Sequence, residues 1–435
     1  MRQRSKDTIY AGLALFAMFL GAGNIIFPPY MGARTGSMWW LSTLGFVLTG
    51  TGLPLLGVLA VSKAGGTADA ISSRVSPNFA KVFNTLILIF IGPLFCIPRT
   101  AATTVELSVV PYLPNLHRQS LTLVVAGIFF ALCLSFALSE NSVIDRMGKY
   151  LTPVLAAFMF FLIILAVVRP AGSPVAPLPE MHNFFYTGFK TGYQTMDGMG
   201  SIVLGGTVAL TLMQKGYRDR ELQRSLNYVA LIAGVGLGIV YVGFSWIGAS
   251  GSATLQGMQS YADLTVSAVQ QMAGLTGQIF LSLLIFFACM TTATGLIVTL
   301  AKYFKILFNG RLSYRCLAII VTLISYAVSS MGVDGIVNLA EPVLDLMYPA
   351  VIVLIILNLF GPKIRHDKAF RGAVYGTLLT SFIMFLSYLP KTAKLAREIL
   401  TTIPLGEQGF PYLIPAAIGL IIGTLIERFY GAKAT

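Results

Sequence analysis

Long apolar segments, separated by short polar ones, recur along the whole chain of 435 residues. Most are close in length to the roughly 20 residues of helix that cross a bilayer core about 30 Å thick. The pattern predicts about twelve transmembrane helices. They cover residues 8–30, 38–62, 82–110, 121–138, 150–168, 184–212, 226–249, 274–308, 317–330, 336–360, 374–389 and 410–426. Residues 258–272 have only mixed apolar content, and we expect them to form an amphipathic helix outside the membrane, before the eighth span.

Composition supports lipid as the solvent of these helices. Hydrophobic residues make up 56% of the chain and charged residues 11%, whereas about 25% of the residues in a soluble domain are charged. No polar linker divides the sequence, so we expect residues 1–435 to form a single all-α integral membrane domain. The net charge of +13 would suit nucleic acid in a soluble protein. Here the basic residues lie between apolar segments, so the expected partner is the bilayer and not nucleic acid.

The basic residues also predict the orientation of the chain. With twelve spans, 22 of the 30 lysines and arginines fall at the termini or in the even-numbered loops, and seven fall in the odd-numbered loops. Loops rich in lysine and arginine remain in the cytoplasm. Both termini are therefore expected on the cytoplasmic side.

The first span is interrupted by Gly21, Gly23 and Asn24, followed by two prolines. Each glycine lowers helix stability by about 1 kcal/mol relative to alanine. One explanation is close packing against another helix, which small residues permit. The other is a broken helix, whose free N–H and C=O groups suit a carboxylate and a cation. The second explanation predicts a site for an amino acid and a coupling ion.

The sixth span contains a similar interruption around Thr195, Met196, Asp197 and Gly198. An aspartate inside a span is a candidate functional residue. Both interruptions lie roughly 20 Å from the expected cytoplasmic face, on antiparallel spans separated by five segments. This arrangement predicts inverted repeats over residues 8–168 and 184–360, followed by two further helices within residues 374–426.

Other polar residues inside spans have two or more explanations. In the eighth span, Thr291 and Thr292 could bond to the preceding turn or complete an oxygen shell around a cation. Arg99 and Glu106 lie on nearly one face of the third span, where they could form a structural pair, line a gate or extend toward the interface. A structural pair is the favoured interpretation. Glu341, in the tenth span, could face an aqueous vestibule together with Asp345.

Several classes of protein lack support in the sequence. The three histidines fall in loops, and no cluster of catalytic residues or metal ligands is apparent, so an enzyme is not expected. An ion channel would require a filter motif repeated around an axis, and no such repeat occurs. We expect no cofactor other than a coupling ion.

The residues from Gly21 to Pro29, the run Thr195–Gly198 and the hydroxyl cluster after Ala288 resemble bacterial branched-chain amino acid:cation symporters of the BrnQ type, the LIVCS family. The resemblance covers essentially the whole chain. It implies the LeuT-like fold of the amino acid–polyamine–cation superfamily. That fold has 5+5 inverted repeats with broken helices 1 and 6, and two additional C-terminal helices.

The resemblance also assigns roles to individual residues. It implies that backbone groups of Gly21, Ala22 and Gly23 hold the substrate carboxylate, and that Asn24 supports the broken helix or an ion. The break Thr195–Gly198 would face the amine and side chain of the substrate, with Asp197 a partner for the amine or cation. The implied sodium site consists of carbonyls of Ala17, Leu20 and Ala288 and hydroxyls of Thr291 and Thr292.

The motif departs from the family pattern of the sodium-coupled leucine transporters in one place. One residue fewer follows Asn24, and their gating arginine is missing there, so their outer gate is not carried over. The expected function is import of leucine, isoleucine or valine by symport across a bacterial cytoplasmic membrane. Sodium is the expected coupling ion. A proton-coupled carrier, or one for another amino acid, is the alternative.

Overall fold

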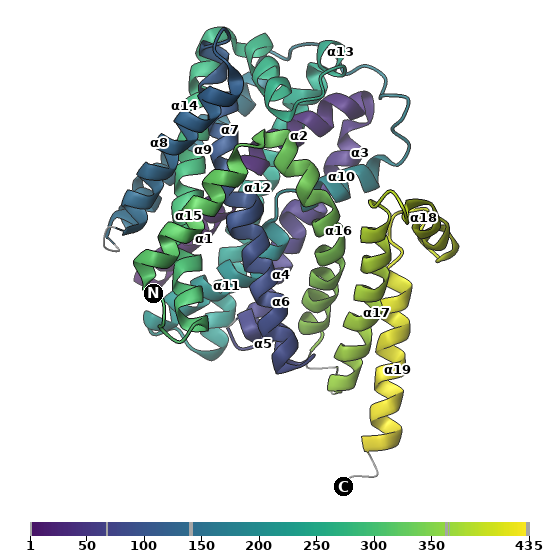
Figure 1. Ribbon diagram of the computed structural model, residues 1–435. Coiled ribbons are helices and arrows are strands. Elements are labelled where there is room, and N and C mark those ends of the chain that lie inside the picture. The colour runs from purple at the N-terminus through teal and green to yellow at the C-terminus, as the bar shows by residue number, and fades with distance from the viewer. Residues whose placement is uncertain (1, 67, 139–141, 362–363, 365, 432–435) are drawn as a thin grey trace.

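The computed structural model describes residues 2–66, 68–138, 142–361, 364 and 366–431. Within these ranges the chain forms helices and no strands (Figure 1). The helices of the first half are α1 Arg2–Phe19, α2 Ala22–Thr35, η1 Gly36–Met38, α3 Trp39–Val47, η2 Leu48–Gly52, α4 Leu53–Lys63, α5 Ala68–Ser73, α6 Pro77–Ile89, η3 Phe90–Cys96, α7 Ile97–Ser108, η4 Val110–Tyr112, α8 Arg118–Leu138, α9 Ser142–Val168, α10 Phe184–Tyr193 and α11 Asp197–Gln214. Those of the second half are α12 Asp219–Ser250, α13 Ser252–Leu255, α14 Tyr261–Leu307, α15 Tyr314–Ser329, α16 Gly332–Leu359, α17 Asp367–Leu386, α18 Ala393–Thr402 and α19 Leu413–Gly431.

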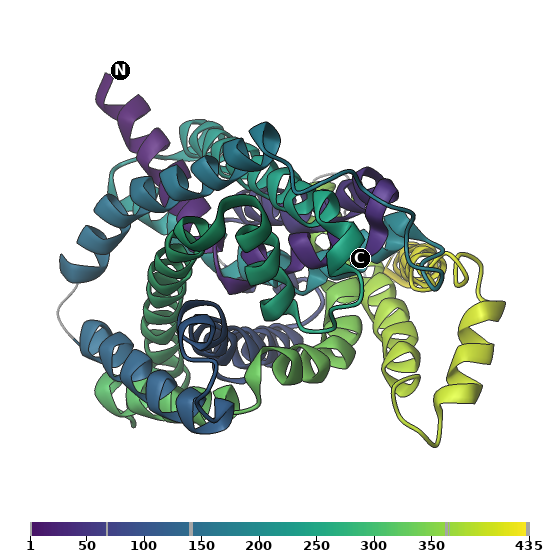
Figure 2. The same cartoon turned by 90° about the horizontal axis from the view of Figure 1, so that it is seen from above.

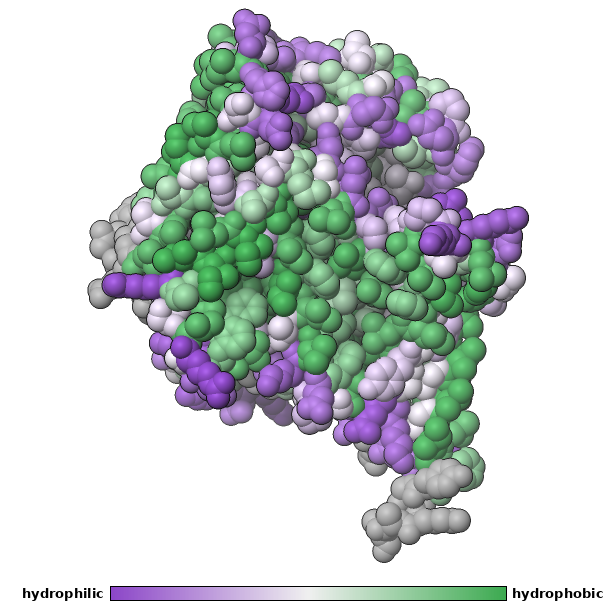
Figure 3. All heavy atoms as spheres, viewed as in Figure 1, coloured by the Kyte–Doolittle hydropathy of each residue, from purple (hydrophilic) through white to green (hydrophobic). Residues whose placement is uncertain are grey.

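The surface is that of a membrane protein. Seven helical segments in the described ranges are long and apolar enough to cross a bilayer, and an eighth is added if α10 and α11 form one bent span. Figure 3 shows apolar side chains in a broad band across the middle of the molecule, with polar side chains at both ends. On α12 the exposed stripe is Leu231, Val235, Ile239 and Val242. A continuous apolar exterior of this size is stable only against lipid, so the chain is an all-helical integral membrane protein.

Both predicted interruptions are breaks in the helices. Helix α1 ends at Phe19 and α2 begins at Ala22, so Leu20 and Gly21 connect two helical halves. Helix α10 ends at Tyr193 and α11 begins at Asp197, with a bend of 45° between them. The local sequences favour these breaks, because glycines lower helix stability at both of them.

Glycine also permits close helix packing, the other explanation considered for it. A Cβ placed on Gly32 of α2 would lie 2.1 Å from the carbonyl oxygen of Ser245 on α12, and one on Gly248 would lie 1.9 Å from that of Pro29. Helices α17 and α19 approach in the same way, where a Cβ on Gly419 would lie 2.1 Å from the Gly372 oxygen. Small residues thus allow the backbones to touch at both interfaces.

The third span is bent within η3, where Gly92 has the non-helical angles φ −81° and ψ −109° and is followed by Pro93. Proline removes one backbone hydrogen bond and clashes with the preceding turn. Beyond the bend the span continues as α7, which carries Arg99 and Glu106.

Two elements differ in detail from the sequence prediction. The helix expected at residues 258–272 is present from Tyr261, but it runs into the eighth span as one helix, α14, bent at Gly274 with φ +58°. The segment between the last two predicted spans was expected to be a loop, but it contains the amphipathic helix α18. Helices α17 and α19 pack together, and α16 packs against α17. Figure 2 shows the C-terminal group, which consists of α17, α18 and α19, at one edge of the molecule.

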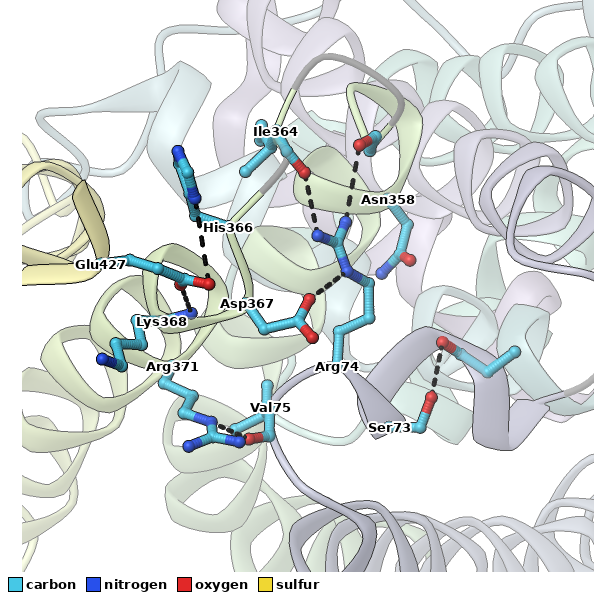
Figure 4. A network of polar contacts seen from close by, with 12 residues as sticks. Ser73, Arg74, Val75, Asn358, Ile364, His366, Asp367, Lys368, Arg371 and Glu427 are labelled. Carbon is cyan, nitrogen blue, oxygen red and sulfur yellow. Dashed lines mark hydrogen bonds and ion pairs between the residues drawn. The ribbon is translucent and has the colours of Figure 1, made fainter. Parts of the chain in front are cut away.

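A polar network attaches the C-terminal group to the rest of the bundle (Figure 4). Arg74, after α5, donates to Asp367 at 2.8 Å and to the Ile364 carbonyl at 2.9 Å, and its guanidinium lies 3.8 Å from the ring centre of Phe370. In the reverse direction, Arg371 of α17 donates to the Val75 carbonyl at 2.6 Å. These contacts fix the start of α17 to the connection between α5 and α6.

Candidate functional site

The two helix breaks meet inside the molecule. Asn24, in the first turn of α2, donates to the carboxylate of Asp197 at 2.7 Å, and Asp197 is the first residue of α11. The Asn24 side-chain oxygen accepts from the backbone N–H of Gly21 at 2.9 Å. One amide therefore closes the first break and joins it to the second. Asn24 and Asp197 are 1% and 6% exposed, so this contact is shielded from water.

Tyr241 completes the contact. Its hydroxyl, on α12, donates to the same Asp197 oxygen at 2.8 Å, and Tyr241 is fully buried. Neutral donors from two different helices thus hold the carboxylate in place, and the start of α11 adds favourable N–H dipoles. Tyr241 was not predicted from the sequence, because a single tyrosine in an apolar span has no local feature that marks it as functional.

Met196 gives the second break its shape. Its φ of +63° lies in the left-handed region, which residues other than glycine seldom adopt. The side chain is 2% exposed. Thr195, beside it, donates its hydroxyl to the Gly192 carbonyl at 2.9 Å and accepts weakly from the Asp197 N–H at 3.3 Å. The backbone between α10 and α11 is therefore held by side chains of the break itself.

Arg99 and Glu106 do not form the structural pair that was the favoured interpretation. Arg99 donates to the Gln194 carbonyl at 2.7 Å, and Glu106 accepts from the Val333 N–H, at the start of α16, at 2.9 Å. Seven residues of helix separate the two side chains by about 10 Å along the axis. Each therefore finds a nearer partner, Arg99 at the break between α10 and α11 and Glu106 at the α16 terminus.

Glu341 belongs to a polar cluster formed by Lys190, Glu341, Asp345 and Tyr388. The Lys190 ammonium lies 2.8 Å from Glu341 and 3.2 Å from Asp345, and the Tyr388 hydroxyl donates to Asp345 at 2.6 Å. This cluster joins α10 to α16 and α17. Lys190 was not predicted as the partner of these carboxylates, although a lysine inside an apolar segment is a usable signal.

The predicted cation residues lie on α1, in the break that follows it, and on α14, which packs against α1. Thr292 donates its hydroxyl to the Leu20 carbonyl at 3.2 Å, across the two helices. Thr291 donates to the Ala288 carbonyl at 2.8 Å, within its own helix. Thr292 thus bridges to the first break, whereas Thr291 has the local bond that is usual for threonine in membrane helices. Ala17 lies one turn before Leu20.

A cavity lies beside the junction of the two breaks. Eight of the predicted site residues line it: Gly21, Ala22, Asn24, Arg99, Thr195, Met196, Asp197 and Thr292. Two other predicted residues pack against side chains instead. A Cβ on Gly23 would lie 2.8 Å from Nη2 of Arg99, and one on Gly198 would lie 2.7 Å from Cδ2 of Leu53. Both glycines are needed for space, which is a packing role.

The cavity extends from the breaks toward the end of the molecule where α1 begins. Met18, Leu204 and Thr299 line it, from the parts of α1, α11 and α14 that run toward that end. On α2, the ring centres of Tyr30 and Phe27 lie 4.0 Å and 5.3 Å from that of Tyr261, at the start of α14. These contacts join the second half of the first broken helix to α14.

Solved structures share this fold. The chain matches the structure of Mhp1, a nucleobase-cation-symport-1 family transporter, in a closed conformation with bromovinylhydantoin bound, with a TM-score of 0.63 and 14% identity over 98% of this chain and 93% of that one. It also matches MhsT in complex with L-phenylalanine, with a TM-score of 0.57 and 18% identity over 95% of this chain and 97% of that one. Broken helices that meet at a buried cavity in a membrane bundle are typical of a transporter.

The family follows from sequence. Residues 4–430 match the family described as branched-chain amino acid transport protein, and the chain belongs to that family of membrane transporters, which are not enzymes. The chain is 32% identical over 432 residues to the branched-chain amino acid permease BraB of Bacillus subtilis, covering 98% of this chain and 96% of the relative. It is 34% identical over 432 residues to the permease BrnQ of the same organism, covering 97% of each.

Proposed function

We propose that the protein is a secondary active transporter that imports leucine, isoleucine and valine by symport with a cation, which we take to be sodium. The observation that carries the proposal is the junction of the two helix breaks at one cavity, where Asn24 joins the N-terminal turn of α2 to Asp197. Helix termini and unwound backbone are the groups with which such carriers bind carboxylates and ions. The family membership and the names of the relatives point to branched-chain amino acids.

In this proposal the chain crosses the membrane twelve times. The segments through α9 form one five-span repeat, those from α10 to α16 form the second in inverted orientation, and α17 and α19 are appended. The breaks then occupy equivalent places in the two repeats, as alternating access about a fixed site requires. We place both termini in the cytoplasm of a bacterial cell and the protein in its cytoplasmic membrane. The cavity would then lead toward the cytoplasm.

The proposed cation site uses carbonyls of Ala17, Leu20 and Ala288 and hydroxyls of Thr291 and Thr292. Hydroxyl and carbonyl oxygens suit a small hard cation. The contact of Thr292 with the Leu20 carbonyl supports this site, since it brings two of the proposed ligands together. Sodium bound there would join the end of α1 to α14, and so couple the first break to the neighbouring helix.

Sodium dependence of uptake tests the cation site. Thr292→Ala should raise the sodium concentration for half-maximal leucine uptake by roughly tenfold, the effect of losing one oxygen contact to a charged group. Thr322→Ala is the control, because Thr322 is a buried threonine of α15, away from the cavity, and its hydroxyl bonds to the Ala318 carbonyl of its own helix at 2.7 Å. Equal sodium dependence in both variants would remove Thr292 from the site.

A proton is the second candidate for the coupling ion. The observation that favours it is the Asp197 carboxyl, buried at the junction and bound by the neutral donors Asn24 and Tyr241. Uptake driven equally well by a proton gradient in the absence of sodium would support this alternative.

A further inference from the structure

Arg99 is a buried charge with few partners. Its side chain is 1% exposed, yet its hydrogen bonds are to neutral groups, from Nη1 to the Gln194 carbonyl at 2.7 Å and to the neighbouring Cys96 thiol, and its Nε has no partner in the described part of the chain. The guanidinium lies 5.1 Å from the ring centre of Phe27. A guanidinium in a membrane interior is strongly disfavoured without an anion, and such residues commonly face a substrate pathway.

Asp197 is the acidic residue that shares the cavity with Arg99, but the two side chains do not form an ion pair. Arg99 and Asp197 line the same cavity, and no ion pair joins them among the described residues. The Asp197 carboxylate accepts from the neutral donors Asn24 and Tyr241 instead. An arginine and an aspartate thus line one cavity without forming an ion pair in the described part of the chain.

The space around Arg99 is preserved by Gly23. A Cβ at position 23 would lie 2.8 Å from Nη2 of Arg99, so any larger residue there would displace the guanidinium. Farther along the same cavity, the wall is aliphatic and includes Leu88, Val203 and Leu296. The cavity therefore combines two opposite charges at the breaks with an apolar extension.

We propose that the Arg99 guanidinium binds the carboxylate of the transported amino acid, while Asp197 receives its ammonium group. This inference rests on the proposed function and makes it specific. The cavity is about 40 Å³ in this conformation, so the surrounding helices must open to admit an amino acid. A zwitterion with an aliphatic side chain would then satisfy both buried charges at once and place its side chain against the apolar wall. Guanidinium is well suited to the carboxylate, since its planar donors can bind both oxygens. The N–H groups at the start of α2 would add to this binding rather than provide it alone.

Binding of leucine and of leucinol to the purified protein tests the assignment. Leucinol keeps the ammonium and side chain of leucine but has a hydroxymethyl group in place of the carboxylate. The wild-type protein should bind leucine roughly tenfold to hundredfold more tightly than leucinol, the usual range for a charge-assisted contact. Arg99→Gln should remove most of this difference by weakening leucine while leaving leucinol unchanged.

A structural role for Arg99 gives a different result. If Arg99 only holds the Gln194 carbonyl, Arg99→Gln should weaken leucine and leucinol by the same factor, which would overturn the inference. Glu106→Gln is the matched control, because Glu106 lies on the same helix and also bonds a backbone group. It should preserve the ratio of the two affinities.

Two further outcomes are informative. If Arg99→Gln aggregates during size-exclusion chromatography, Arg99→Lys takes its place. It keeps the charge but lacks the planar fork, so leucine affinity should fall several-fold with leucinol unchanged, and an equal loss for both ligands would contradict the inference. A wild-type protein that binds leucine as weakly as leucinol would overturn the role of Arg99 alone. A wild-type protein that binds neither would overturn the proposed function as well.

Discussion

Asp197 connects three helices, α2, α11 and α12. It begins α11, it ends the break that Met196 shapes, and it accepts from Asn24 and Tyr241 on two other helices. A buried carboxylate is disfavoured unless it is hydrogen-bonded, and Asn24 and Tyr241 provide these hydrogen bonds. Its position at the junction of the breaks is consistent with the proposed role as partner of a substrate amine or cation.

Replacing that carboxylate tests its charge. Asp197→Asn keeps the size of the side chain but removes the negative charge, so leucine uptake should fall by roughly tenfold to hundredfold. Tyr241→Phe is the graded control, because it removes one neutral donor and leaves the charge in place. It should reduce uptake less than Asp197→Asn does. Normal uptake by Asp197→Asn in proteoliposomes would make Asp197 a structural residue.

Met196 is a strained position whose effect on stability can be measured. A β-branched side chain is especially disfavoured at its φ of +63°, so Met196→Val should lower the free energy of unfolding by about 1–3 kcal/mol beyond the loss of packing. Met199→Val is the control, since Met199 is equally buried but lies within helix α11. Thermal unfolding in detergent should therefore show a lower midpoint for the Met196 variant. Equal midpoints would contradict strain at the break.

At this scale the sequence was most informative where a residue departed from its surroundings. Asn24 and Asp197 are polar residues in apolar, glycine-rich segments, and the structure places them in contact. The hydrogen-bond partners of Arg99 and Glu106 could not be predicted. Their spacing places both on one face of the helix, but it does not show which groups of other helices lie against that face. Tyr241 became recognisable only through contacts between distant segments, and these contacts also identified the partners of Lys190.

At the scale of elements, the molecule depends on glycine for two different purposes. At the breaks, glycine weakens the helix, whereas at the interfaces of α2 with α12 and α17 with α19 it lets the backbones approach. The sequence could predict the breaks because the glycines were grouped with a polar residue. It could not separate the two purposes at single glycines, since the neighbouring backbone decides between them.

The interface of α17 with α19 gives a test at this scale. Gly419→Ala would place a methyl group 2.1 Å from the Gly372 oxygen, so the helices must separate, and we expect a loss of about 1–3 kcal/mol in stability. Gly238→Ala is the control, because a Cβ at that position in α12 meets nothing within 4 Å. Its thermal midpoint should stay the same or rise. A Gly419 variant as stable as the control would contradict tight packing there.

At the scale of the whole molecule, the hydrophobic pattern predicted an all-helical membrane protein, and the structure confirms that class. The pattern could not predict the bend of α14 at Gly274 or the amphipathic helix α18, because both depend on the segments they pack against. It also could not predict that Tyr261 of α14 packs on Phe27 and Tyr30 of α2, because these residues are remote in sequence.

The central claim is that a cation gradient drives amino acid uptake through the junction of the two breaks. Purified protein in liposomes, with an inward sodium gradient and labelled leucine outside, tests it most directly. Leucine should accumulate above its external concentration, collapse of the gradient should abolish that accumulation, and unlabelled isoleucine or valine should compete. Leucine that only equilibrates across the membrane, at the same rate with and without a sodium or proton gradient, would contradict the account.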